Sequence, residues 1–232
     1  FGWRGVFWMI SGLALILIIW IKISLPHLAG QPASKQQSIL NVLVHPGIGA
    51  ILAVIFVWIL AHNILYTFIS PYLAAVQLSE HIDLILLIFG LSSIFGIWIT
   101  GIWIDRSLRK LTLISLTGFA IAALFMGLSS HHIWLVMLGI VLWGMTFGGA
   151  PTLLQTALAD VAGENVDIAQ SMLVTVFNLA VAGGGILGGI LLQNVGIDSF
   201  FVCIIALSLL GLSIVFFAHK NGFKSGHRLG SQ

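Results

Sequence analysis

Seven apolar runs of about 20 residues dominate this sequence and restrict the folds open to it. They cover residues 5–23, 47–69, 84–104, 111–129, 133–155, 170–192 and 199–218. A helix that crosses the hydrocarbon core of a bilayer needs about 20 largely apolar residues. Hydrophobic residues make up 59% of the 232 residues and charged residues only 7%, too few charges for the surface of a soluble domain. The sequence therefore predicts an all-α polytopic membrane protein with seven transmembrane helices.

The connections between these runs are short, with one exception between the first two runs. The exception is rich in Pro, Ser, Gln and Lys, a composition typical of a linker. We therefore expect four segments, which are a transmembrane span at 1–23, a linker at 24–46, a six-helix bundle at 47–218 and a tail at 219–232.

Basic residues gather on one side of the predicted topology. If the linker lies in the cytoplasm, that side also receives most of the basic side chains, which are Lys22, Lys35, Arg106, Arg109, Lys110, Lys220, Lys224 and Arg228. The opposite side receives only Arg4. Because positive charge is retained on the cytoplasmic side of membrane proteins, this bias predicts a cytoplasmic linker, 105–110 turn and tail.

Polar side chains form stripes on three interior spans and are scarce on the first and last spans. The stripes are His62, Tyr66 and Ser70 with Asn63 and Thr67, then Thr152, Gln155 and Thr156, then Ser171, Thr175 and Asn178. Such groups either hydrogen-bond between helices or line a water-filled path. Three stripes on interior spans favour a shared cavity, and our candidate substrate-cavity residues are Asn63, Tyr66, Thr67, Gln155 and Asn178.

Titratable groups are nearly absent from the centres of the spans. His62 is the exception, and we expect it to be neutral and hydrogen-bonded rather than a proton carrier. The loop residues with ligand chemistry match no defined metal-site spacing; they are Glu80, His81, Asp83, His131 and His132. The sequence has no catalytic motif and no long basic block, so it predicts no enzyme, metal, cofactor or nucleic-acid partner.

Four stretches resemble the major facilitator superfamily. Gly101, Asp105, Arg106, Arg109 and Lys110 resemble its G-x-x-x-D-[RK]-x-G-[RK]-[RK] turn, with Leu108 in place of the second glycine. FGWRGVFWMI looks like the entrance to span 6. HNILYTFISPYL is similar to span 7 of the drug/proton antiporter branch, with its arabinose-export-like and purine-efflux-like members. QSMLVTVFNLAVAGGGILGGILL resembles span 11, where Asn178 matches a recurrent Asn.

The resemblance implies spans 6 to 12 of a twelve-span carrier, namely span 6, a cytoplasmic inter-half linker and the C-terminal half, with spans 1 to 5 missing. It implies that spans 7, 8, 10 and 11 face a central cavity. It also implies that Asp105 latches one conformation by meeting a helix end of missing span 5, while the basic residues brace the turn.

The function expected from this resemblance is secondary active transport in the bacterial inner membrane. The carrier would export a drug, sugar or nucleoside-like compound by alternating access, with a coupling proton. Its partners would be the small-molecule substrate, the lipid bilayer and the missing N-terminal half. Two alternatives remain open, a nutrient importer of the same fold and a membrane assembly or sensor protein that transports nothing.

Overall fold

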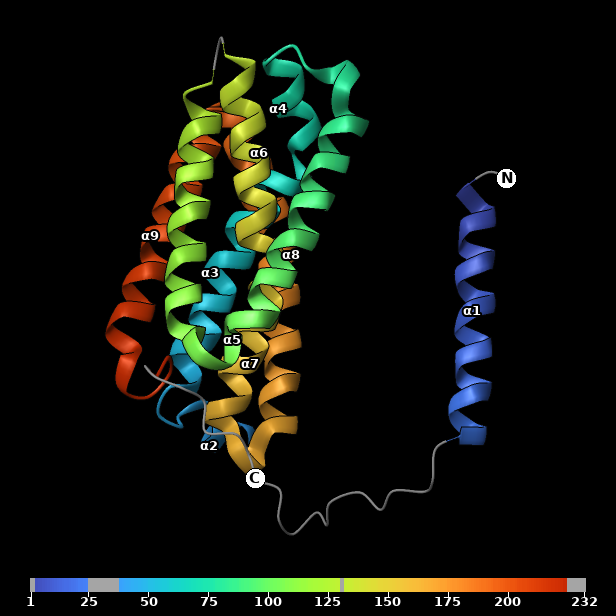
Figure 1. Cartoon of the computed structure of the whole chain (residues 1–232), viewed down its shortest axis with the longest axis vertical. Coiled ribbons are helices and arrows are strands. Elements are labelled where there is room, and N and C mark those ends of the chain that lie inside the picture. The colour runs from blue at the N-terminus through green and yellow to red at the C-terminus, as the bar shows by residue number, and fades with distance from the viewer. Residues whose placement is uncertain (1–2, 25–37, 130–131, 225–232) are drawn as a thin grey trace. The chain divides into compact units, whose positions relative to one another are not determined.

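A computed structural model describes residues 3–24, 38–129 and 132–224, and helices are the only regular elements in those ranges (Figure 1). The chain divides into two units, Phe1–Gln36 and Gln37–Gln232. The described part of the first unit is one helix, α1 (Trp3–Ser24), which carries Arg4 in its first turn and Lys22 in its last turn and is largely apolar between them. The expectation of an all-α protein is confirmed.

The second unit contains helices and short 3₁₀ turns. In chain order they are α2 (Ile39–Leu43), α3 (Ile48–Thr67), α4 (Ile69–Ala75), η2 (Ser79–His81), α5 (Ile82–Gly127), α6 (Ile133–Gly148), α7 (Ala150–Ala162), η3 (Gly163–Asn165), α8 (Val166–Asn194), α9 (Ser199–Phe217) and η4 (Ala218–Lys220). The unit boundary falls inside the expected linker, because Ser38 caps α2 and Val42 is buried in the second unit. The division into four segments stays a prediction. Lys35, His131 and Arg228 lie outside the described residues.

Five helical stretches in the described ranges are long and apolar enough to cross a membrane, rather than the expected seven. They are Arg4–Ser24, Ile48–Thr67, Ser79–Gly127, Ile133–Asn194 and Ser199–Lys220. Two of them, of 49 and 62 residues, would extend roughly 75 and 90 Å as straight helices, whereas the hydrocarbon core is about 30 Å thick. The first of these stretches reverses within α5 and the second reverses at the short 3₁₀ turn η3, so each contains two of the expected spans.

The first reversal lies within α5. Ser107 is its one residue with non-helical backbone angles (φ −149°, ψ 32°). Figure 1 shows α5 in green as a helix that descends, turns and returns beside itself. Both arms contact α6, since Gly96 lies against Met145 and Gly118 against Thr146. A turn is therefore present where the sequence predicted one, but it is tighter than the interval that separates spans 84–104 and 111–129. Its place on the cytoplasmic side stays a prediction.

Prolines explain two further differences from the expected boundaries. The run 133–155 is not one helix: α6 ends at Gly148, and α7 carries Pro151 in its first turn and continues to Ala162. The run 47–69 likewise ends at Thr67, and α4, which contains Pro71, follows the non-helical Phe68. Proline cannot donate the backbone hydrogen bond that continues a helix. Both breaks therefore lie where a proline removes that donor.

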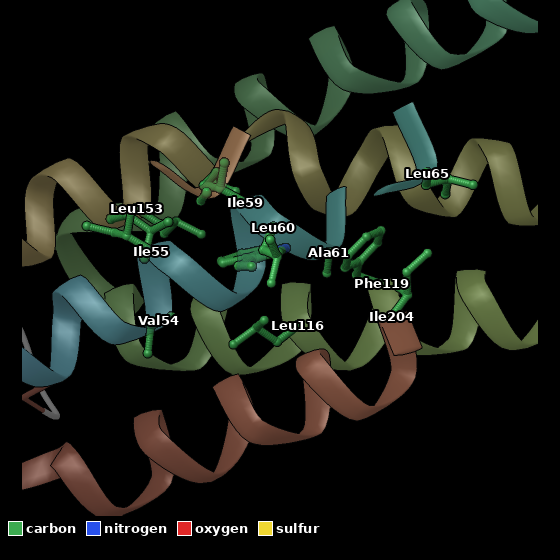
Figure 2. Packing of buried hydrophobic residues seen from close by; sticks show 14 of the residues in the cluster. Val54, Ile55, Ile59, Leu60, Ala61, Leu65, Leu116, Phe119, Leu153 and Ile204 are labelled. Atoms are coloured by element: carbon green, nitrogen blue, oxygen red, sulfur yellow. The ribbon is translucent and has the colours of Figure 1, made fainter. Parts of the chain in front are cut away.

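Helix α3 is the centre of the second unit. Of the most apolar 18-residue stretch of α3, 72% is buried, whereas the corresponding share for Ser79–Gly127 is 11%. Figure 2 shows Leu60 and Ala61 of α3 beside Leu116 and Phe119 of the second α5 arm and Ile204 of α9. Burial of such side chains removes apolar surface from the surrounding solvent and fixes their rotamers by close packing. Because this packing fixes the position of α3, it also fixes where the polar residues on that helix lie.

The C-terminal end of the described chain closes against the start of α3. Gly47 has a positive φ of 97°, and a Cβ there would collide with the backbone carbonyl of Asn221. Phe223 is fully buried. The expected tail therefore begins inside the packed structure, and residues 225–232 lie outside the described ranges.

Candidate functional site

His62 of α3 lies among aromatic rings from α5 and α6. Its ring stacks on Phe147, with centroids 3.4 Å apart and planes 2° apart, and on Tyr66, with centroids 5.4 Å apart and planes 19° apart. The indole N–H of Trp143 donates a hydrogen bond of 3.0 Å to Nδ1 of His62. Since Nδ1 accepts, the neutral imidazole carries its proton on Nε2. The expected hydrogen bond to His62 is therefore present.

Tyr66 and Thr67 follow one turn later on α3 and are exposed. Half of the Tyr66 side chain is accessible (50%), while Phe89 and Trp143 lie at its sides with ring centroids 6.4 Å away. These two predicted cavity residues therefore lie at the surface of the described structure, and their place in a substrate cavity stays a prediction.

Asn63 occupies a different setting, because it is buried at the contact between α3 and α8. Its Nδ2 donates a 3.0 Å hydrogen bond to the Ile59 carbonyl of its own helix. A Cβ at Gly184 of α8 would stand 2.6 Å from the Cβ of Asn63. The glycine lets the two helices approach closely at this asparagine, so Asn63 takes part in helix packing as well as in the polar stripe.

Gln155 lies where α7 meets α3 and α8. It lines a small pocket whose other walls are apolar, formed by Ile55, Ile59, Pro151, Leu154, Leu173 and Phe177. The Gln155 side chain is exposed, and its backbone carbonyl accepts a 3.3 Å hydrogen bond from Nε2 of Gln170 in α8. Helices α3, α7 and α8 therefore meet at this pocket, and Gln155 is the predicted stripe residue that lines it.

Asn178 follows Phe177 on α8 and is exposed. Its Nδ2 donates a 2.8 Å hydrogen bond to the Val174 carbonyl one turn earlier. The amide oxygen projects beyond that bond and is available as an acceptor. Asn178 is thus next in sequence to a pocket residue, but the pocket itself is lined without it.

The sequence analysis missed the aromatic partners of His62. Trp143 and Phe147 are spaced by four on α6, and Phe89 comes from the first arm of α5. The sequence signal was the i, i+4 spacing of Trp143 and Phe147, which places them on one helix face but does not show which helix they face. It did not stand out, because large apolar residues occur throughout α6.

One residue of the motif turn, Arg109, contacts α9, and four others lie at exposed positions. Nη2 of Arg109 donates a 3.0 Å hydrogen bond to the carbonyl of Phe216, in the last turn of α9. The exposed positions are Gly101, Asp105, Arg106 and Lys110. The helix end that the latch hypothesis assigns to Asp105 belongs to the other half of the fold, so the latch stays a prediction.

Comparison with known proteins gives a family match and several curated relatives. Residues 76–230 match the profile of the Major Facilitator Superfamily. Relatives named purine ribonucleoside efflux pump NepI, from Shigella sonnei, Escherichia coli O6:H1 and Escherichia coli O157:H7, are 30% identical over 205 residues, which is 85% of this chain and 50% of each relative. The chain thus spans about half the length of these relatives. The superfamily consists of multi-pass membrane transporters rather than enzymes, and this chain belongs to it.

Proposed function

We propose that this chain forms much of the second half of a secondary transporter in the bacterial inner membrane. The transporter exports a small organic compound in exchange for protons by alternating access. In this proposal each helical arm crosses the bilayer, with the two arms of α5 and the α6–α7 and α8 arms as separate crossings. The name of the relatives, an efflux pump, supports the outward direction.

The observation that carries the proposal is the convergence of α3, α7 and α8 around Gln155. In an apolar bundle, exposed amides and hydroxyls are costly unless they meet water, a partner or a ligand. Thr152, Gln155, Thr175 and Asn178 are exposed on α7 and α8, and the pocket lined by Gln155 joins these helices to the middle of α3 at Ile55 and Ile59. A face of this kind is suited to line one wall of a substrate path.

The positions of the acidic residues bear on which half of the transporter supplies the proton-coupling carboxylate. The seven Asp and Glu residues are Glu80, Asp83, Asp105, Asp160, Glu164, Asp167 and Asp198. All lie near helix ends or reversals, and none lies in the middle of an apolar arm. A proton-coupling carboxylate facing the substrate path would therefore be supplied by the other half.

Flux in membrane vesicles tests this proposal. The complete protein, as its gene encodes it, is expressed, and inverted vesicles are given an acidic interior. Labelled inosine, arabinose and ethidium represent the nucleoside-like, sugar and drug classes. We expect vesicles that contain the protein to accumulate more of at least one compound than vesicles that lack it. This additional accumulation should disappear when a protonophore collapses the proton gradient.

The alternatives give different outcomes in the same experiment. A nutrient importer would instead accumulate its compound in right-side-out vesicles with an acidic exterior. A membrane assembly or sensor protein would produce no flux of any compound in either orientation. Either result contradicts the proposed export.

A further inference from the structure

Three aromatic rings form a continuous stack that ends at an exposed tyrosine. Phe147 lies 3.4 Å from His62 and His62 lies 5.4 Å from Tyr66, measured between ring centroids. Exposure rises along the stack, because His62 is only 9% exposed and Tyr66 is 50% exposed. The outermost ring is therefore the part of the stack that a ligand can reach.

The inner rings of the stack are held in place before any ligand arrives. Trp143 is fully buried, donates to Nδ1 of His62 and packs on Phe89 with ring centroids 4.2 Å apart. A tyrosine also has few rotatable bonds, so fixing its ring costs little conformational entropy. A preorganised surface of this kind adds affinity because binding does not have to order it.

Tyr66 lies on the side of α3 that meets the Gln155 pocket. Ile59 lines that pocket, and Tyr66 follows it by two helical turns, about 10 Å along the same face. Thr67 follows Tyr66 on α3, Gln155 lines the pocket and Asn178 follows the pocket residue Phe177. All three side chains can form hydrogen bonds and none is charged. The surroundings thus offer ring stacking and neutral hydrogen bonds.

From this arrangement we propose that Tyr66 is a stacking platform for a flat, uncharged ring of the transported compound. The inference rests on the proposed transport function and adds the chemical class that this half recognises. A neutral heteroaromatic ring gains attraction from an offset stack on the tyrosine face. Its edges, or hydroxyl groups attached to it, would take hydrogen bonds from the neutral amides.

Equilibrium dialysis of the complete protein in lipid nanodiscs tests the platform. The probes are tritiated inosine, adenosine and caffeine, which contain flat uncharged rings, and ribose, which does not. Tyr66→Leu removes the aromatic face, Tyr66→Phe keeps it, and Trp134→Leu is the control because it removes an aromatic residue that is 81% exposed elsewhere. Thermal unfolding of each variant checks that the protein is folded.

We expect Tyr66→Leu to weaken binding of a flat probe about 10- to 100-fold, since stacking of one base on an aromatic residue has this magnitude. Tyr66→Phe should stay within about threefold of the unmodified protein, because the ring face is retained. Trp134→Leu should bind as the unmodified protein does, and ribose should not depend on Tyr66.

Two results would overturn the platform. One is equal binding of the flat probes by folded Tyr66→Leu and the unmodified protein. The other is that the protein transports a compound without a flat ring, such as arabinose, and binds none of the flat probes. That result would refute the platform and leave the transport function intact. Conversely, Tyr66-dependent binding without flux in vesicles supports the platform and refutes transport.

Discussion

Arg109 joins the reversal of α5 to the end of α9 through the backbone carbonyl of Phe216. The hydrogen bond from Nη2 measures 3.0 Å, and the guanidinium carbon lies 5.8 Å from the centroid of the Phe216 ring. Helix C-termini carry unpaired carbonyls and a partial negative charge, which a cation stabilises. The resemblance implied basic residues that brace the turn, and the structure shows which one has a partner and where.

Replacement of this arginine should therefore loosen the contact between α5 and α9. We expect Arg109→Ala to lower the free energy of unfolding by about 1 kcal/mol, since solvent screens part of the interaction. For a protein of this size that is a decrease of about 2–4 °C in the melting temperature. Lys110→Ala is the control, because Lys110 is exposed. Equal melting temperatures for the two variants, measured in detergent, would contradict the role of Arg109.

The hydrogen bond between Trp143 and His62 should be visible in a double-mutant cycle. Trp143→Phe leaves Nδ1 of a buried histidine without its donor, and we expect a loss of about 1–3 kcal/mol. His62→Phe combined with Trp143→Phe removes both polar groups, so the double variant should lose less than the sum of the single losses. Trp134→Phe, at an exposed tryptophan, is the control. Additive losses would mean that the bond contributes no coupling energy.

The first α5 arm and α6 meet at glycines that leave no room for a side chain. A Cβ at Gly148 would collide with the backbone carbonyl of Ser93, and one at Gly144 would lie 2.6 Å from the Phe89 carbonyl oxygen. We expect Gly148→Ala to destabilise the protein by about 1–3 kcal/mol, because backbone must move to relieve the collision. Gly185→Ala is a matched control, since nothing lies within 4 Å of a Cβ at that glycine. It should be neutral or stabilising by up to about 1 kcal/mol.

These glycines show where prediction from sequence ends. The spacing pairs Gly184 with Gly188 and Gly185 with Gly189 in the same way. In the structure the first pair contacts Asn63 of α3 and Phe68, the residue between α3 and α4, while Gly185 faces open space. A repeat of four fixes which residues share a helix face, but not which neighbouring helix covers that face.

The apolar runs located the helices well, because hydrophobicity is a property of the local sequence. The kinks and the aromatic cluster required tertiary information. A single non-helical residue, Ser107, replaces an expected interhelical loop, and the partners of His62 are supplied by α5 and α6 at sequence distances no local pattern reveals. For the cavity candidates, the sequence provides residue type alone, whereas burial, which separates buried Asn63 from exposed Asn178, depends on tertiary packing.

The latch hypothesis predicts a change in turnover without a matching change in affinity. Asp105→Asn removes the charge that would favour a helix N-terminus of the other half, an interaction of about 0.3–1 kcal/mol. Turnover should change by about two- to fivefold, while the concentration for half-maximal transport changes less. Asp198→Asn, near the start of α9, is the comparison variant. Unchanged turnover in vesicles for Asp105→Asn would contradict the latch.

Asn178 and Asn194 form a matched pair for testing the cavity wall. Both are exposed on α8, and each donates a 2.8 Å hydrogen bond from Nδ2 to a carbonyl one turn earlier. Only Asn178 lies beside the pocket residue Phe177, whereas Asn194 ends the helix. We expect Asn178→Ala to reduce vesicle flux about 5- to 10-fold through loss of a substrate hydrogen bond. Asn194→Ala should retain full flux at the same amount of protein in the membrane. Because the two residues share residue type, exposure and local bonding, equal flux by both variants would remove Asn178 from the substrate path.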